Sequence, residues 1–361
     1  MSAAPLVSVC VPTYNGAEFL DACLDSVLGQ ELSDIEVLIG DDRSIDDTLA
    51  IARRRSDPRL RILPFHERAG MARNWSRTLL EARGKYVALV AQDDLLAPAW
   101  GVRLAGLLED HPEASFAFGH RAFGMTDERS RAIVGHFFES SYPAQLERFY
   151  ARIGTVVSPA TMVEMAMEHR FELNLTGEPS FNLLRRDHAA IREGYHSELR
   201  QMLDWEFATR FFADAPILHC PEVLGTYRIH VAGSTVGNSA LTTQYGDYAR
   251  LIDLVLQRFA GLLSRTHVEA LRAVRLEREQ MLLGHARNLA VHAEALEKER
   301  EELRAETREL TAHARTLETE RDELLVNVRH LEQTVRRIRS QPVYRALCKI
   351  KDVFSARRLD G

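Results

Sequence analysis

The sequence predicts an α/β fold, with a mostly parallel β-sheet flanked by helices and followed by a long α-helical coiled coil at the C-terminus. Strand-like and helix-like segments alternate through the first 120 residues, which is typical of a parallel sheet covered by helices. Leucine then recurs at every seventh residue near the C-terminus, as in coiled coils. The chain has 361 residues, 45% of them apolar, which is enough for a sizeable core and an extension.

The alternation can be followed along the chain. Short apolar runs predict strands at 6–11, 35–39, 60–63, 86–90 and 115–118. Apolar residues at helical spacing predict helices at 18–28, 46–55, 71–83 and 98–110. Successive strand–helix–strand units are right-handed and pair in parallel. The region 120–200 is less regular, with strands expected at 181–184, 217–220 and 224–229, and helix beyond residue 245.

Net charge, cysteine spacing and the lack of long apolar runs limit the classes of protein to which this chain can belong. The net charge of −6 gives no indication of nucleic-acid binding. The four cysteines lie far apart without metal-type spacing, which favours free thiols in a reducing compartment. The first residues do not resemble a secretory signal, and no run of 18 apolar residues occurs. We therefore expect a cytoplasmic protein.

The C-terminal region carries a seven-residue repeat. One heptad position is occupied by Leu282, Leu289, Leu296, Leu303, Leu310, Leu317, Leu324, Leu331 and Ile338. Four residues after each leucine come Ala286, Ala293, Arg300, Thr307, Ala314, Arg321, Val328 and Val335. This pattern predicts a helical linker at 241–280 and a parallel coiled coil, most simply a dimer, at 281–340. The alternative is a single solvated helix held by ion pairs.

The last residues, 341–361, predict a basic amphipathic tail. Its apolar face consists of Val343, Leu347, Ile350 and Phe354. Its basic residues are Arg345, Lys349, Lys351, Arg357 and Arg358. Such a segment can lie on an anionic membrane surface, so we expect peripheral contact with the inner face of a membrane. The alternative is that this face packs on the N-terminal domain.

Acidic pairs follow two of the expected strands. Asp41 and Asp42 follow the second strand, and Asp93 and Asp94 follow the fourth. Ligands bind at the carboxyl ends of parallel strands, and clustered carboxylates favour a divalent cation such as Mg²⁺ or Mn²⁺, which would bring a phosphate with it. Neither a G-x-G-x-x-G nor a P-loop motif is present. Either pair alone could simply belong to a turn.

Together these segments resemble the family 2 glycosyltransferases, which are inverting enzymes of the GT-A fold. The resemblance covers roughly residues 6–235. It is carried by VSVCVPTYNGAEFLDACLDSVLGQ at 7–30, EVLIGDDRSIDDT at 36–48, ERAGMARNWSRTLLEARGKYVALVAQDDLLAP at 67–98, LTGEPSFNLLRRD at 175–187, MLDWEFATRFF at 202–212 and LGTYRIHVAGST at 224–235. It implies a catalytic domain at 1–240, with a donor-nucleotide half at 6–120 and an acceptor half at 120–235.

The resemblance also implies roles for individual residues. Those expected to bind the nucleotide sugar are Pro12, Thr13, Tyr14, Asp41, Asp42, Arg73, Asn74 and Asp93. Asp94 matches the metal-binding aspartate, and His230 matches a histidine close to the diphosphate. Asp204 matches the catalytic base. The implied reaction moves a sugar from a nucleoside diphosphate, with UDP favoured by family frequency, to a hydroxyl of a glycan or lipid-linked acceptor in surface glycan synthesis.

Two departures from the family pattern leave alternatives open. Many members read D-x-D-D, whereas Ala91 occupies the first position here, which would weaken metal binding. Many members also have an acidic residue before the base, where this chain has Leu203. Asp204 could otherwise be a helix cap, and His230 a structural histidine. The second interpretation of the whole chain is a degenerate, transferase-like scaffold or binding protein assembled through its coiled coil.

Overall fold

The computed structural model describes residues 4–63, 65–231, 233 and 241–342. Internal contacts divide the chain into two units, 1–286 and 287–361. The apolar and basic residues expected at 343–358 lie outside the described residues, so the membrane contact of the tail stays a prediction. No helix among the described residues is long and apolar enough to cross a membrane.

The first unit is built on a nine-stranded sheet in the order β3-β2-β1-β4-β8-β6-β9-β5, with β7 paired to β9. The strands are β1 (Val7–Thr13), β2 (Ile35–Asp41), β3 (Leu60–Ile62), β4 (Tyr86–Leu89), β5 (Leu95–Leu96), β6 (Phe116–Met125), β7 (Val156–Val157), β8 (Asn182–Arg185) and β9 (Ile217–Ile229). Strands β1 to β4 pair in parallel, as predicted. β6 also runs parallel to β9, whereas β8 is antiparallel to both of its neighbours, β4 and β6.

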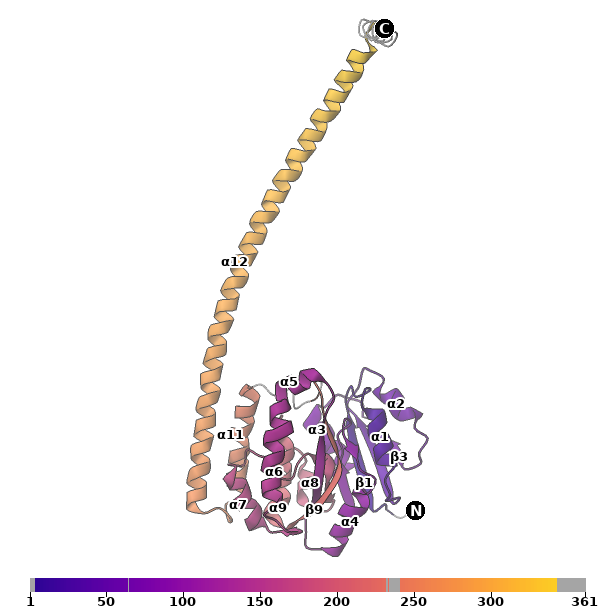
Figure 1. The fold of residues 1–361 in the computed structure, drawn as a ribbon, viewed down its shortest axis with the longest axis vertical. Coiled ribbons are helices and arrows are strands. Elements are labelled where there is room, and N and C mark those ends of the chain that lie inside the picture. The colour runs from indigo at the N-terminus through magenta and orange to yellow at the C-terminus, as the bar shows by residue number, and fades with distance from the viewer. Residues whose placement is uncertain (1–3, 64, 232, 234–240, 343–361) are drawn as a thin grey trace, which may run out of the picture. The chain divides into compact units, whose positions relative to one another are not determined.

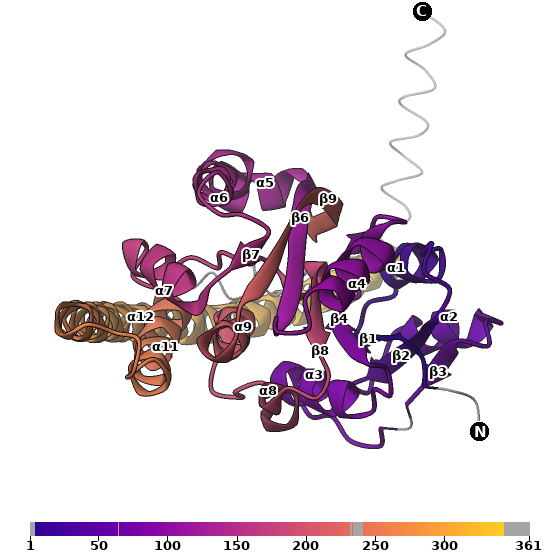
Figure 2. The same cartoon turned by 90° about the horizontal axis from the view of Figure 1, so that it is seen from below.

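Helices cover both faces of this sheet (Figures 1 and 2). The α-helices of the described residues are α1 (Leu20–Leu28), α2 (Thr48–Arg54), α3 (Met71–Leu80), α4 (Trp100–Asp110), α5 (Glu128–His136), α6 (Tyr142–Tyr150), α7 (Pro159–Glu168), α8 (Ala189–Glu193), α9 (Leu203–Asp214), α11 (Leu241–Arg258) and α12 (Arg265–Ser340), of which α12 extends from the first unit into the second. A π-helical turn, Phe137–Ser141, joins α5 to α6, and a 3-10 turn, Pro179–Phe181, precedes β8.

The sheet separates two hydrophobic clusters. Alternate residues of β1 point to opposite faces: Val9 packs with α1 and α4, whereas Cys10 packs with α3, α8 and α9. Cys10, Cys23 and Cys220 are buried free thiols, which confirms the prediction for these three. The larger cluster extends into the expected linker, because Leu251 and Ile252 of α11 and Leu271 of α12 are fully buried in it.

Most predicted elements are confirmed to within a few residues, but β6 extends to Met125 beyond the strand predicted at 115–118, β7 was not predicted, and two further differences involve β9. The runs at 217–220 and 224–229 form one continuous strand, β9, in which Pro221, Glu222 and Val223 are exposed. The short strand β5, which pairs with β9 at Leu95↔Thr226, was not predicted. Two-residue strands carry no periodic signal, and their pairing depends on a partner more than 100 residues away.

Candidate functional site

The carboxyl ends of β1, β2 and β4 meet at one edge of the sheet and bring the predicted motifs together. Thr13 at the end of β1 is in register with Asp41 at the end of β2, and its hydroxyl donates to Asp41 Oδ1 at 3.0 Å. Gln92, after β4, exchanges two hydrogen bonds of 3.0 Å with the backbone of Tyr14. The loops after three separate strands are therefore joined directly.

The Asp41–Asp42 pair is buried and heavily hydrogen-bonded. Asp42 accepts the backbone N–H groups of Ala69 at 2.6 Å and Gly70 at 2.9 Å, and the Arg77 guanidinium lies 2.9 Å from it. Its exposed fraction is 3%. These contacts hold the loop before α3 against the end of β2, so Asp42 shapes this edge of the sheet.

Two predicted nucleotide contacts are placed differently from the rest. Asn74 is buried, and its amide donates to the carbonyl of Gly40 at 2.7 Å, so it supports the end of β2. Arg73 is exposed and lines a separate 400 Å³ hollow with Arg200. The ring of Tyr14, which is expected to contact the nucleotide, has the Arg68 guanidinium 4.1 Å from its centre. Pro12 is buried within β1.

The second acidic pair divides into a buried and an open carboxylate. Asp94 is fully buried and accepts from the Ser180 hydroxyl at 2.5 Å and the Arg228 N–H at 3.1 Å. Burial, followed by the charge of Asp93, raises the pKa of Asp94 well above its usual range. Asp93 is partly exposed and lies 2.8 Å from His230 Nε2. The buried Nδ1 of His230 has no hydrogen-bond partner among the described residues.

A cavity of about 620 Å³ joins this pair to the candidate base. Asp93, Asp94, His230 and Asp204 all line it. Its walls also carry several large apolar and aromatic side chains: Trp75, Phe137, Phe138, Tyr142, Tyr227 and Tyr248. The volume lies within the usual range for a small-molecule site, and the mixture of apolar walls and a few convergent polar groups is typical of one.

Asp204 sits in the first turn of α9 and faces this cavity. Its carboxylate accepts the backbone N–H of Trp205 at 2.8 Å and the amide of Asn174 at 3.1 Å. Burial raises the pKa of Asp204 to about 7. The group can therefore take up or release a proton near neutral pH, which suits a general base better than an ordinary surface carboxylate does.

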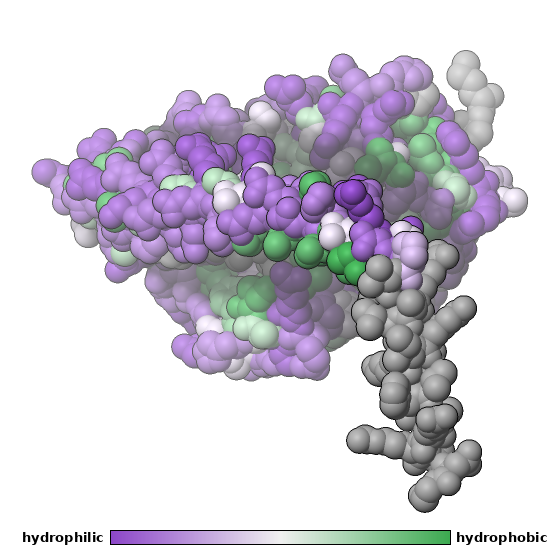
Figure 3. Space-filling model, turned by 90° about the horizontal axis from the view of Figure 1, so that it is seen from above, coloured by the Kyte–Doolittle hydropathy of each residue, from purple (hydrophilic) through white to green (hydrophobic). Residues whose placement is uncertain are grey.

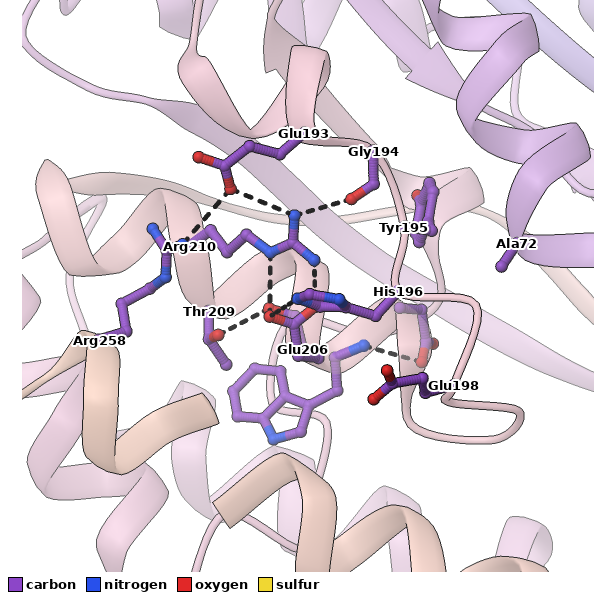
Figure 4. Close-up of polar contacts among 12 residues, drawn as sticks. Ala72, Glu193, Gly194, Tyr195, His196, Glu198, Glu206, Thr209, Arg210 and Arg258 are labelled. Carbon is purple, nitrogen blue, oxygen red and sulfur yellow. Dashed lines mark hydrogen bonds and ion pairs between the residues drawn. The ribbon is translucent and has the colours of Figure 1, made fainter. Parts of the chain in front are cut away.

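A buried ion pair anchors the helix that carries Asp204. Arg210 and Glu206 lie one turn apart on α9, both nearly inaccessible to solvent. Arg210 also donates to the carbonyl of Gly194 at 2.7 Å and lies 3.4 Å from Glu193 (Figure 4). At the start of the helix, Asp247 of α11 accepts the backbone N–H groups that precede α9, at residues 200, 201 and 202. The first contact holds α9 against the segment before it, and the second holds the start of α9 against α11.

Breaking this buried pair should destabilise the protein strongly. Arg210→Met removes the cation and leaves Glu206 without it in a buried site, so the free energy of unfolding should fall by about 3–5 kcal/mol. Chemical denaturation monitors the change. Glu269→Gln on α12 breaks an exposed pair of the same i,i+4 spacing and should leave the denaturation midpoint unchanged. Equal effects of the two variants would contradict the structural role of Arg210.

Several residues of the cavity were missed in the sequence analysis. Asn174 contacts Asp204, and Ser180 and Arg228 contact Asp94. Glu178 lines the same cavity. The segment 174–180 contains Gly177 and Pro179, which mark a turn. That signal could have placed these polar side chains together on one loop, but nothing local indicates that the loop faces the end of β4.

Comparison with known proteins identifies the family of this chain. The family model described as Glycosyl transferase family 2 matches residues 8–167. An uncharacterized Mycobacterium tuberculosis protein, MT1568, is 30% identical over 250 residues, covering 69% of this chain and 75% of the relative. Escherichia coli chondroitin synthase is 38% identical over 97 residues, 26% of this chain and 14% of that enzyme.

Two further proteins extend the comparison. A putative teichuronic acid biosynthesis glycosyltransferase of Bacillus subtilis, TuaG, is 33% identical over 124 residues, 34% of this chain and 48% of the relative. The crystal structure of Staphylococcus aureus TarS 1–349 in complex with UDP-GlcNAc has a TM-score of 0.55 at 18% identity, covering 75% of this chain and 72% of that chain. Its likeness concerns the fold, which is of the GT-A type. The family match and the coverage of the MT1568 relative establish that the chain belongs to glycosyltransferase family 2.

Proposed function

We propose that the protein is an inverting glycosyltransferase that moves a sugar from a nucleoside diphosphate sugar, with UDP as the favoured nucleotide, to an acceptor hydroxyl. The observation that carries the proposal is the single cavity shared by the Asp93–Asp94 pair and Asp204. A donor phosphate would bind at the first, and an acceptor hydroxyl at the second. The aromatic walls provide apolar faces against which sugar rings can stack.

In this mechanism Asp204 removes the proton of the acceptor hydroxyl while the hydroxyl oxygen attacks the anomeric carbon. The bond between that carbon and the diphosphate breaks on the opposite side, so the configuration inverts. The raised pKa of Asp204, about 7, makes its carboxylate a stronger base than an ordinary aspartate. The amide of Asn174 and the N–H of Trp205 hold the carboxylate in place.

The residues at the end of β4 fit a divalent cation. Asp94 and Asp93 repel each other when ionised, and the Nδ1 of His230 has no partner among the described residues. Mg²⁺ or Mn²⁺ would be held by these carboxylates with His230 beside them and would neutralise charge on the leaving diphosphate. The described residues contain no cluster of three or more ligating side chains, so phosphate oxygens and water would complete the coordination, as is usual for Mg²⁺.

A panel of nucleotide sugars tests the donor class. UDP-, GDP- and dTDP-sugars are added with Mn²⁺, and the melting temperature is measured, since a ligand bound only by the folded state stabilises it by mass action. We expect UDP-sugars to raise it, and to release UDP on incubation. Stabilisation without any release of nucleotide over long incubation would favour the degenerate scaffold instead.

We also propose that α12 pairs with a second copy of this chain as a parallel coiled coil. Beyond Val274 no described residue of α12 is buried, and Figure 3 shows hydrophobic residues along this helix among hydrophilic ones. The heptad residues Leu289, Leu296, Leu303, Leu310, Leu317, Leu324, Leu331 and Ile338 are each about half exposed. An identical helix presents the same repeat and would cover them.

Negative charge at the leucine positions of the proposed coiled coil should dissociate the oligomer. Leu303→Asp with Leu310→Asp places two carboxylates where leucines would meet, and light scattering should then report the monomer mass. Ala305→Asp with Ala312→Asp adds the same charge on the opposite face of the same two turns and should keep the oligomer mass. A monomeric wild-type protein would refute the coiled coil.

Surface glycan synthesis is the setting we propose for this reaction. Relatives named for chondroitin synthesis and for teichuronic acid biosynthesis support it, although the matches span only 14% and 48% of those proteins. The acceptor would be a growing glycan or a lipid-linked sugar presented to the cavity from the side of residues 120–235.

A further inference from the structure

The turn formed by residues 174–178 presents two different polar groups to the cavity that contains Asp204. Asn174 and Glu178 both line that cavity. The Asn174 amide donates to Asp204 Oδ2 at 3.1 Å. Glu178 acts on the same carboxyl through its negative charge. One turn therefore provides a hydrogen-bond donor and a like charge to a single aspartate.

The orientation of the Asn174 amide is fixed by its neighbours. Its Oδ1 accepts the backbone N–H of Gly177 at 2.9 Å and the hydroxyl of Thr176 at 3.2 Å. Its Nδ2 also donates to the carbonyl of Gly177 at 2.9 Å. Because a backbone N–H can only donate, the oxygen must face Gly177 and the NH₂ group must face Asp204. The donor on the carboxylate is thus built into the turn.

Glu178 forms an ion pair with a buried arginine. Arg121 of β6 is almost fully buried, and its Nε lies 2.6 Å from Glu178 Oε2. The Arg121 guanidinium also donates to the hydroxyls of Tyr142 at 2.7 Å and Tyr150 at 2.9 Å. Gly177 has φ +80°, and a Cβ there would lie 2.4 Å from Arg121 Cζ. The backbone of the turn is therefore closely fitted around this guanidinium.

We propose that Asn174 and Glu178 are positioning residues that adjust the ionisation of Asp204 in opposite directions. The N–H of Asn174 favours the carboxylate form, and the charge of Glu178 favours the protonated form. Burial is the main cause that raises the pKa of Asp204, and these two residues adjust it further in opposite directions. The inference rests on the proposed function, in which Asp204 is the base.

Other titratable groups face Asp204 from two neighbouring segments. The charge of Asp204 acts on Tyr142 of α6 and on Tyr195, in the segment before α9. Burial raises the pKa of each tyrosine well above its usual range, so both stay neutral at physiological pH and add no charge. On α9 itself, the charges of Glu206 and Arg210 are paired with each other.

Two substitutions that preserve side-chain shape test the inference. Asn174→Asp keeps an oxygen for the Gly177 N–H but replaces the donor with a negative charge. Glu178→Gln removes a negative charge. The protonation of Asp204 is followed in the full chain by NMR titration of ¹³C-labelled aspartate carboxyls, with its signal identified by its loss in Asp204→Asn.

The two substitutions should move the titration midpoint of Asp204 in opposite directions. Asn174→Asp should raise the pKa of Asp204 by about one to two units, since a charge-assisted hydrogen bond is replaced by repulsion. Glu178→Gln should lower it by about one unit, and the double variant should lie near the wild-type value. Glu172→Gln removes another carboxylate that lines the same cavity, and the causes that shift the pKa of Asp204 include Glu178 but not Glu172, so this variant should leave the midpoint unchanged.

Shifts in the same direction, or no shift in either variant, would overturn the inference. Melting curves show whether each variant is folded, and Asn174→Ala, which removes the side-chain donor without adding a charge, gives a second test with a rise in the same direction. Failure of the proposed function looks different: Asp204→Asn would retain turnover whatever the titration midpoints are.

Discussion

Asp204→Asn should lower the turnover of sugar transfer by about 10²–10⁴-fold, the usual contribution of a general base. Asparagine has the same shape but cannot take the proton of the acceptor hydroxyl. Donor affinity should hardly change, because in the proposed mechanism the donor diphosphate is held by the Asp93–Asp94 pair and not by Asp204. The measurements are kcat with the best nucleotide sugar and the donor dissociation constant.

The pH dependence gives this variant a second signature. Since the pKa of Asp204 is raised to about 7, kcat/KM of the wild-type protein should fall about tenfold per pH unit below that value, and Asp204→Asn should lack this limb. Asp214→Asn serves as the control, because Asp214 is exposed at the other end of α9. This variant should keep the wild-type turnover and the same fall of kcat/KM below pH 7. Full turnover by Asp204→Asn would show that the base lies elsewhere.

The raised pKa of Asp204 also predicts that Asp204→Asn is more stable than the wild-type protein at alkaline pH. The folded state binds more protons than the unfolded state between the ordinary pKa of aspartate and about 7, so the free energy of unfolding falls as pH rises through that window. Above pH 7 the ionised Asp204 opposes folding. Asp204→Asn should therefore melt at a higher temperature than the wild type at pH 8, which distinguishes loss of the base from loss of the fold.

Asp94→Asn should abolish metal-dependent donor binding, with a loss of affinity of about 10²–10³-fold, because several kcal/mol of charge stabilisation at the diphosphate disappear. Asparagine is preferable to alanine here, since Asp94 is fully buried and accepts hydrogen bonds from Ser180 and Arg228. Calorimetric titration of a UDP-sugar with and without Mn²⁺ measures the effect.

The control for this variant is Asp47→Asn, which removes an exposed aspartate near the same edge of the sheet. It should bind donor as the wild type does. Metal-dependent binding that survives in Asp94→Asn would mean that Asp93 and His230 suffice, or that the cation site lies elsewhere.

Much of the donor half could be predicted from the sequence because its signals are local. Each strand of β1 to β4 is a short apolar run followed by the residues that face the site, and parallel pairing places those residues at one edge. Thr13 thus contacts Asp41 directly, and Tyr14 contacts Gln92. The family resemblance added Asp204 and His230, which no local pattern distinguishes from a helix cap or a structural histidine.

The acceptor half was harder to predict because its contacts are distant in sequence. Arg121 and Glu178 meet across 57 positions of chain, and Asp247 of α11 supports residues 45 to 47 positions before it. Neither pairing leaves a periodic pattern. Burial also changed the expected chemistry, since Asp94 is a hydrogen-bonded core residue as well as a candidate ligand.

The anomeric configuration of the first product tests the central claim most directly. With an α-linked UDP-sugar, Mn²⁺ and water as acceptor, ¹H NMR resolves the anomer released before mutarotation. Attack by water activated by Asp204 on the face opposite the diphosphate predicts the β-anomer, at a rate that falls in Asp204→Asn. Release of the α-anomer by the wild-type protein would contradict the proposed mechanism.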